Sequence, residues 1–452
     1  MNNSPHILGE APIGRLLVQY SLPSIIAMTV TSLYNIIDSV FIGHGVGAMA
    51  ISGLAITFPL MNLLIAFCTL VGVGGATIAS IRLGQKDKDG AEDIAGNVFV
   101  LCIINAVFYG GLALLFLDDI LRFFGASDAT LPYARDFMQI ILLGAPISYL
   151  MVGLNNVMRS TGYPKKAMLS SLVSVACNVV IAPVFIFVFG WGIRGAATAT
   201  IVSQAITLIW IMSHFLNKNT YVRLKRKSMK LKKRIIKNIF SIGMSPFAMN
   251  VCACCIVIFI NHQLQAYGDD YSIGAFGIVN RIQMVFVMII MGIAQGMQPI
   301  ASYNYGAGQI TRVFRALRMG VIAGCIISST GFIFGVFFPE MFVGAFTTDA
   351  ILTERSVHAL QISVLAFPIV GAQIIICQFF QSIGKAGIAI FLSLSRQLLF
   401  LLPGLMLLPL FLDLWGVWWS MPVSDVLSAA VSICMAFYQM RKMHARLQPA
   451  GH

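Results

Sequence analysis

An acidic residue at the end of a charge-free segment is the side chain in this sequence best suited to do chemistry. Asp38 follows an apolar run from Leu16 that holds no other charged residue. Thr31, Tyr34, Asn35 and Asp38 are spaced i, i+3, i+4 and i+7, so they share one face of a helix. A carboxyl group in such a segment is costly unless it is paired, hydrated or protonated. The pattern indicates binding and release of a proton or a cation, or else an acid that caps the outer end of its helix.

The chemistry open to Asp38 depends on its burial. Burial favours the neutral form of a carboxyl group, so Asp38 can load and release protons, and in its ionised form it can ligate sodium together with nearby oxygens. Pro23 lies in the same segment, where its missing N–H permits a kink. We therefore predict a hinge at Pro23, with a static bend as the alternative.

The segments that must position these residues are those of a membrane protein. Of 452 residues, 58% are hydrophobic and 10% are charged, and the mean hydropathy is +0.85. A water-soluble domain of this composition could not cover its apolar surface. Apolar runs of at least about 20 residues can cross a bilayer. They fall at 16–37, 51–80, 94–117, 133–158, 167–189, 195–216, 238–263, 272–298, 314–337, 357–381, 387–411 and 415–440. We predict an all-α integral membrane protein with twelve transmembrane helices.

The sequence is duplicated. Ile78-Ala79-Ser80 returns 222 positions later as Ile300-Ala301-Ser302, and Asp38 falls on Asn261 at an offset of 223. Each repeat holds six predicted helices, so both repeats enter the membrane in the same direction. The expected fold is two six-helix lobes related by a pseudo-two-fold axis along the membrane normal. The predicted boundaries are 1–217 for the N-terminal lobe, 218–237 for a basic cytoplasmic link, 238–441 for the C-terminal lobe and 442–452 for a cytoplasmic tail.

The charges predict the orientation. The formal net charge is +13, and most of the Lys and Arg residues fall in loops on one side of the predicted helices, which is therefore cytoplasmic together with both termini. The basic stretch 218–237 is expected to act as a tether attracted to anionic lipid head groups. Because the positive charge sits in short loops beside apolar helices, we expect a lipid bilayer and no nucleic acid as the partner of this chain.

Signatures of enzymes are scarce. We find no convincing nucleophile elbow, no paired histidines for zinc and no phosphate-binding loop. The cluster Cys252, Cys254 and Cys255 has no second cysteine pair or histidine at ligand spacing, so packing explains it better than a metal site. We expect a protein that is not an enzyme, with no cofactor and no metal other than a sodium ion at Asp38.

Two longer motifs carry a resemblance to a known family. One is Asn35-Ile-Ile-Asp38-Ser-Val-Phe-Ile-Gly43 with the following Gly53-Leu-Ala-Ile-Thr-Phe-Pro59, and the other runs from Gln295 to Gly308. With them the chain resembles the multidrug and toxic compound extrusion (MATE) family, in particular its MepA-type bacterial branch, through essentially all twelve helices. The resemblance implies a monomeric antiporter in the bacterial cytoplasmic (inner) membrane. It would export amphipathic, often cationic drugs in exchange for inward H⁺ or Na⁺ by alternating access.

The resemblance also implies a cation site in the N-terminal lobe. The acid of the first helix corresponds to Asp38, and oxygen ligands on later helices correspond to Asn155, Asn178 and Thr200. Such ligands suit a hard cation. Ala182 stands where many relatives carry a second acid, and the acids that some relatives carry on helices seven and ten are missing too, so the site holds less negative charge.

A substrate cleft is expected beside the cation site. Flexible thioethers tolerate varied ligand shapes. The predicted lining is Tyr34, Asn35, Met61, Met151, Gln283, Met284 and Met288. The second lobe carries Arg281, Arg396 and Asp425 at membrane depth, and we predict that Arg396 pairs with Asp425 in a structural role.

Two other functions remain open at this stage. A flippase for lipid-linked saccharides of the same superfamily would be expected to line its cleft with several Arg or Lys for pyrophosphate, and the first lobe has none in the middle of a helix. An integral membrane enzyme would show turnover without an ion gradient. A major-facilitator transporter also has two parallel halves, but its basic signature after the second helix is absent from residues 83–90.

Overall fold

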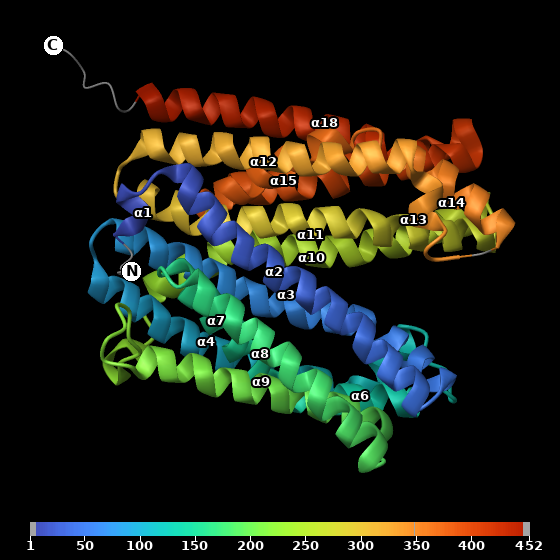
Figure 1. Ribbon diagram of the computed structural model, residues 1–452, viewed down its shortest axis with the longest axis horizontal. Helices are drawn as coiled ribbons and strands as arrows, with labels where there is room; N and C mark the ends of the chain where they lie inside the picture. Colours follow the sequence, from blue (N-terminus) through green and yellow to red (C-terminus); the bar gives the residue numbers. More distant parts are fainter. Residues whose placement is uncertain (1–5, 348, 446–452) are drawn as a thin grey trace. The chain divides into compact units, whose positions relative to one another are not determined.

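The computed structural model describes residues 6–347 and 349–445. Inside its helices it leaves the side chains at 34–36, 39–40, 43–44, 48–49, 51, 270 and 444–445 without description. The described residues form helices and no strand (Figure 1). In the first half these are α1 (Ile7–Glu10), α2 (Ile13–Gly45), α3 (Ala48–Gly84), α4 (Lys88–Leu115), α5 (Leu117–Phe123), α6 (Leu131–Leu143), α7 (Ala145–Ser160), α8 (Pro164–Pro183), η1 (Val184–Val188), α9 (Gly192–Leu216) and η2 (Arg226–Met229). In the second half they are α10 (Lys233–Tyr267), α11 (Asp270–Gly306), α12 (Ile310–Phe337), α13 (Pro339–Val343), α14 (Ala350–Ser363), α15 (Phe367–Ser382), α16 (Ala386–Leu394), η3 (Ser395–Leu401), α17 (Leu402–Leu407) and α18 (Pro409–Ala445).

The helices are long and apolar enough to cross a membrane. Ten spans qualify singly, and two bent helix pairs raise the number to 12 when each pair is one span. The prediction of an all-α protein with twelve membrane helices is confirmed in this sense. Large apolar side chains such as Phe108, Leu115 and Phe411 are 69%, 80% and 82% exposed, as expected where lipid is the solvent.

Two predicted helices are each broken near the middle. The run 133–158 is divided between α6 and α7, which meet at 56°, and the run 357–381 between α14 and α15, which meet at 57°. Pro146 and Pro368 stand in the first turn of the second helix of each pair. A proline there has no N–H to donate to the preceding turn and its ring crowds that turn, so the chain bends at this point.

The duplication predicted from short motifs extends to the boundaries of the helices. Adding 222 to the bounds of α3 gives those of α11, and the same shift carries α4 onto α12 and α7 onto α15. Since helix ends follow from caps, glycines and prolines, the two repeats have kept the local signals that start and stop each helix.

Two compact units divide the chain. One contains the residues through Glu10 and Ile26–Asn250, and the other contains Ala11–Ile25 and the residues from Val251 onward. The first part of α2 thus belongs to the second unit, and the first part of α10 belongs to the first unit. The predicted lobes placed both helices whole in their own repeats, so the observed boundaries differ there.

Small residues explain these boundaries. In the second unit, a Cβ on Gly296 of α11 would lie 2.5 Å from the backbone of Ser21, and one on Gly292 would lie 2.9 Å from that of Ile25. In the first unit, a Cβ on Gly243 of α10 would lie 1.8 Å from the carbonyl oxygen of Leu70 in α3. Such close approaches of two backbones require a residue without a side chain and fix helix pairs inside a membrane.

We expect Gly243→Ala to destabilise the protein, because overpacking at a close contact typically costs about 1–3 kcal/mol. Gly277→Ala is the matched control, since a Cβ there meets nothing within 4 Å, and replacing glycine inside a helix gains about 0.5–1 kcal/mol. Thermal denaturation of the purified protein in detergent should give a lower midpoint for the first variant and an equal or higher one for the second. Equal shifts in both would contradict the assigned crossing.

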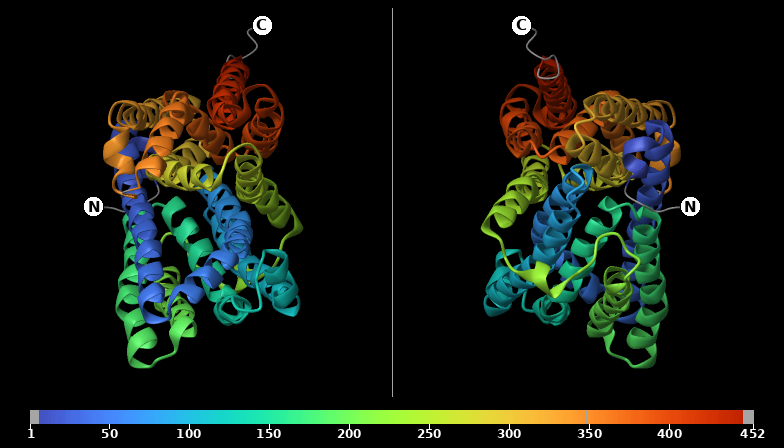
Figure 2. Two further views of the ribbon diagram at one scale, coloured as in Figure 1. Left: turned by 90° about the vertical axis from the view of Figure 1, so that its right-hand side faces the viewer. Right: turned by 90° about the vertical axis from the view of Figure 1, so that its left-hand side faces the viewer.

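The segment between the two repeats is bound to α4. Asn97, fully buried, donates its amide to the carbonyl oxygens of Ser228 (3.4 Å) and Lys230 (3.1 Å) and accepts from the backbone N–H of Lys232 (3.0 Å). The buried carboxylate of Glu92 pairs with Lys225. We call residues 218–232 the strap, which is drawn in yellow-green in Figure 2. The strap therefore packs along α4, and its attraction to lipid head groups stays a prediction.

Asn97→Ala should release the strap, because the carbonyl and N–H groups that Asn97 satisfies would lose their partner, at a cost of about 1–3 kcal/mol. Limited trypsin digestion of the folded protein is expected to cut the strap several times faster in this variant. Asn219→Ala serves as the control, since the exposed Asn219 side chain makes no hydrogen bond with the described residues. An unchanged cleavage rate in Asn97→Ala would show that other contacts hold the strap.

Candidate cation site

The site is built around the acid that the sequence singled out. Asp38 lies in the second half of α2 and is 9% exposed. Its Oδ1 atom is buried and has no hydrogen-bond partner among the described residues. A buried carboxylate oxygen without a donor is costly, so this atom calls for a proton or a cation beside it.

Helix register places Asp38 level with Asn178. The end of α2 touches η1, since a Cβ on Gly45 would lie 2.4 Å from the side chain of Ile186. From there α2 and α8 run back in the same direction (Figure 1). Asp38 precedes Gly45 by seven residues and Asn178 precedes Ile186 by eight, so at about 1.5 Å per residue the two side chains stand at the same depth.

Asn178 and Thr200 are joined. The side-chain amide of Asn178, which is 3% exposed, donates to Thr200 Oγ1 at 3.2 Å, and this hydroxyl donates in turn to the carbonyl oxygen of Ala196 at 3.1 Å. The bond links α8 to α9 and orients the amide so that its donor end faces Thr200. Two of the four predicted cation-site residues are therefore brought together.

Asn155 of α7 has its amide nitrogen engaged elsewhere. Its Nδ2 donates to the carbonyl oxygen of Ala167 at 2.9 Å and to Ser170 Oγ at 2.6 Å, both on α8. The equivalent residue of the second repeat, Cys377, donates to the carbonyl oxygen of Ala389 at 3.6 Å. An offset of 222 carries the first pair onto the second, so this contact is a link between two helices that both repeats have inherited. The carbonyl oxygen of Asn155 remains its one atom suited to a cation.

The repeat suggests a substitution that separates the two roles of Asn155. Asn155→Cys keeps a donor to Ala167, as Cys377 does for Ala389, whereas Asn155→Ala removes it. We expect the cysteine variant to stay within about 1 kcal/mol of the wild-type stability and the alanine variant to lose more. Thermal midpoints measure the link, and ion-driven transport measures the cation role. If both variants lost stability equally, the link would not be the reason for the residue.

This arrangement can hold a proton or a hard cation. The described residues include no group of three or more His, Cys, Asp or Glu side chains that could bind a metal ion. A sodium ion would need neutral oxygens from Asn155, Asn178 or Thr200 beside the single carboxylate, whereas a proton needs Asp38 alone. Ala182, fully buried one turn after Asn178, supplies no second acid.

The predicted cleft residues lie in both units. In the first unit, Met61 on α3 and Met151 on α7 are half-buried. In the second unit, Gln283 and Met288 of α11 are half-buried and Met284 is 50% exposed. The side chains of Tyr34 and Asn35 lie outside the described residues. That these residues line one substrate cleft stays a prediction.

The hinge predicted at Pro23 falls within a helix. The structure places Pro23 inside α2, three residues before Ile26, where α2 passes from the second unit to the first. Movement at this position stays a prediction.

Sequence reasoning missed Ser170, Glu92 and Asn97. Ser170 donates to Ala167 at 2.8 Å and accepts from Asn155, and no motif distinguishes it from other membrane serines. Glu92 and Asn97 could have been found from their spacing, because Glu92, Asp93 and Asn97 bring polar groups into the first turns of an apolar helix next to the basic strap.

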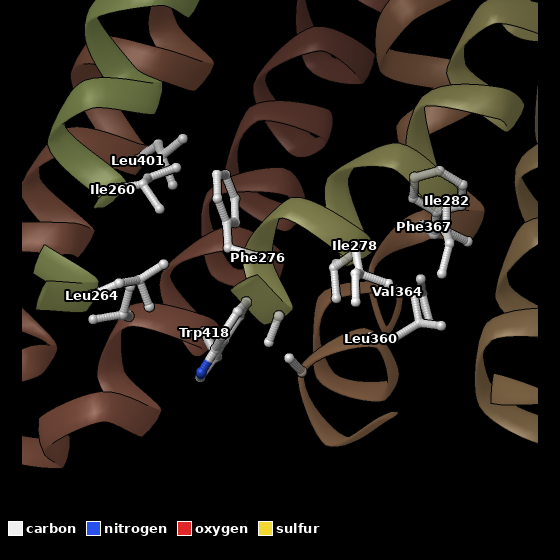
Figure 3. Packing of buried hydrophobic residues seen from close by; sticks show 14 of the residues in the cluster. Ile260, Leu264, Phe276, Ile278, Ile282, Leu360, Val364, Phe367, Leu401 and Trp418 are labelled. Carbon is white, nitrogen blue, oxygen red and sulfur yellow. The ribbon is translucent and has the colours of Figure 1, made fainter. Parts of the chain in front are cut away.

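The predicted ion pair of the second unit is confirmed. Arg396 Nε of η3 donates to Asp425 Oδ1 of α18 at 2.7 Å. Both helices belong to the core of that unit, where Leu401 of η3 and Trp418 of α18 pack with Ile260, Leu264 and Phe276 (Figure 3).

Two six-span repeats with a buried acid on the first span define a membrane transporter of the repeat type. The chain belongs to the MatE family, whose model matches residues 23–184 and 242–407.

Several known proteins are similar to this chain. Multidrug export protein MepA of Staphylococcus aureus is 26% identical over 443 residues, which is 95% of this chain and 94% of the relative. A crystal structure of MATE in the bent conformation matches with a TM-score of 0.93 at 23% identity over 98% of both chains. A MOP superfamily transporter from Pyrococcus furiosus, described as having a binding pocket of reverse polarity that suggests a different function, matches with a TM-score of 0.92 at 23% identity over 98% of both chains.

Proposed function

We propose that this protein is a secondary active antiporter that exports amphipathic, often cationic compounds in exchange for an inward H⁺ or Na⁺. The observation that carries the proposal is the buried, unpartnered Oδ1 of Asp38 on the first membrane helix of the first repeat. Membership of the MatE family and the similarity to a named multidrug export protein support drugs as the substrate class.

The mechanism uses one carboxyl group for two ligands. Ionised Asp38 attracts a cationic compound while the protein is open to the cytoplasm. When the coupling ion or a proton binds Asp38 from outside, the carboxyl group loses its free charge and no longer favours the compound, which leaves. Reversal of access returns the ion to the cytoplasm. The two ligands exclude each other because a single charge is available in a region of low dielectric.

A proton is the simpler coupling ion for the described residues. Sodium needs several neutral oxygens beside the carboxylate, and the hydroxyl of Thr200 already accepts from Asn178 and donates to Ala196. A proton requires one buried carboxyl oxygen that lacks a donor, which Asp38 provides. The absence of an acid at Ala182 favours the same choice, since a sodium ion would have only one carboxylate to neutralise its charge.

The proposed location is the bacterial cytoplasmic membrane with both termini inside, because the basic loops lie on that side. The strap, with Lys225, Arg226 and Lys227, would then be cytoplasmic. We also propose that the protein works as a monomer.

The test is uptake of a fluorescent organic cation into proteoliposomes under an imposed proton or sodium gradient. We expect one gradient to drive transport in the wild type, and Asp38→Asn to lose that gradient-driven part by about tenfold or more, as for a group used in the step itself. If the proton gradient alone drives uptake, the coupling ion is H⁺.

Asp118→Asn is the matched control, because Asp118 forms an exposed ion pair with Arg135 (3.4 Å) in the same unit, and such pairs contribute little. Full gradient-driven transport in Asp38→Asn would move the ion site away from α2. Lack of transport under either gradient would count against drug export and make lipid-linked substrates the next test.

A further inference from the structure

A charged pair in the second unit lies about one helical turn from the positions that correspond to Asn178 and Thr200 of the first. An offset of 222 carries Asn178 to Phe400 and Thr200 to Pro422. Arg396 lies four residues before Phe400, and Asp425 lies three residues after Pro422. Because the two helices run in opposite directions, both displacements of about one turn point the same way along the bundle. The pair itself corresponds to Ser174 and Ser203, so the second repeat carries two charged residues where the first carries two serines.

The pair lies deep in the membrane region. Arg396 stands at the middle of the 22-residue span Ala386–Leu407, and Asp425 near the middle of the 35-residue span Pro409–Met443. Charged residues at this depth are costly and mark functional positions by default. Packing alone could be achieved by apolar residues of similar volume, since a buried ion pair stabilises a fold weakly.

The guanidinium of Arg396 is only partly used. Its Nε bonds to Asp425, whose side chain is 6% exposed, but the Arg396 side chain is 35% exposed. No other partner of Arg396 occurs among residues 6–347 and 349–445. Its two terminal nitrogens keep a fork of donors whose planar geometry matches an acidic group with two oxygens.

The bond between Arg396 and Asp425 lies on the buried side of α18. Asp425 belongs to the buried face of α18 with Ser424 and Ser428, whereas Val426 and Leu427 on the opposite face are 49% and 45% exposed. Since Arg396 bonds to Asp425, its guanidinium lies on the side of α18 that packs against η3. Donors that remain free at membrane depth call for an acceptor, which the oxygens of a ligand can supply.

We propose that Arg396, held in place by Asp425, binds the carboxylate of an amphipathic solute. This inference deepens the proposed function, on which it rests for transport, by extending the substrate class to zwitterionic and acidic compounds. Asp425 acts as a positioning residue, because it fixes the guanidinium through Nε and leaves the terminal nitrogens for the ligand. The equivalent of Asp38 in this repeat is Asn261, so the second unit has no acid there to repel a carboxylate.

The test compares two dyes that differ in one charge, rhodamine B with a free carboxylate and its ethyl ester. Fluorescence anisotropy of the full-length protein in a non-ionic detergent gives both dissociation constants without any gradient. The wild type should prefer rhodamine B. In the double variant Arg396→Gln/Asp425→Asn, which keeps hydrogen-bonding groups and leaves no unpaired charge, the preference should fall about tenfold or more, with ester binding unchanged.

Arg281→Gln is the matched control, since Arg281 is an exposed arginine of the same unit with no Asp partner among the described residues. It should keep the preference. Equal loss in this variant would show that the preference does not depend on Arg396 in particular and would overturn the site, as would parallel weakening of both dyes in the double variant or no preference in the wild type. Displacement of rhodamine B by phosphatidylglycerol but not by phosphatidylcholine would assign the site to a lipid head group instead.

The outcome is separable from that of the proposed function. If Asp38→Asn left transport intact while the double variant lost the carboxylate preference, antiport through Asp38 would be wrong and the Arg396 site would stand. If Asp38→Asn abolished transport while the double variant bound both dyes as the wild type does, the site would be wrong and the antiport proposal would stand.

Discussion

The absence of water in the bilayer core is the constraint on which this structure depends. Backbone groups there must bond within the chain, so the spans are helices. The same demand governs the side chains. Thr207 and Ser363 return their hydroxyls to carbonyl oxygens one turn back, at 2.9 and 2.7 Å. Once these local bonds are made, a buried polar atom without a donor becomes conspicuous, and Oδ1 of Asp38 is one of these.

Because the sequence is duplicated, each polar residue of one repeat can be compared with the residue at the equivalent position of the other. Where the two repeats share a polar contact, as with Asn155 and Cys377 on their neighbouring helices, the contact belongs to the framework. Where they differ, the difference points to function. Asp38 corresponds to Asn261 in the second repeat, and Ser174 and Ser203 of the first repeat correspond to the salt-bridged Arg396 and Asp425 of the second. The two repeats thus carry their charged membrane residues at different positions.

Much of this could be predicted from the sequence, because hydropathy and motif spacing record it directly. The twelve spans, the repeat and the Arg396–Asp425 pair were all predictable. The bends before Pro146 and Pro368 were missed because the apolar runs continue through them. The division of α2 and α10 between units depends on how closely Gly243 and Gly296 approach another backbone. The sequence alone does not show which helix a glycine in an apolar run contacts. Asn155 was matched to a ligand position, but its bond to Ala167 depends on packing between helices.

The exchange of helix segments between the units has a consequence for the gene. The first part of α2 packs with the second unit through Gly292 and Gly296, and the first part of α10 packs with the first unit through Gly243. A reading frame cut within the strap would leave each fragment with an unmatched stretch of helix and an unfilled glycine groove. Each fragment would therefore need the other to cover its exchanged helix segment.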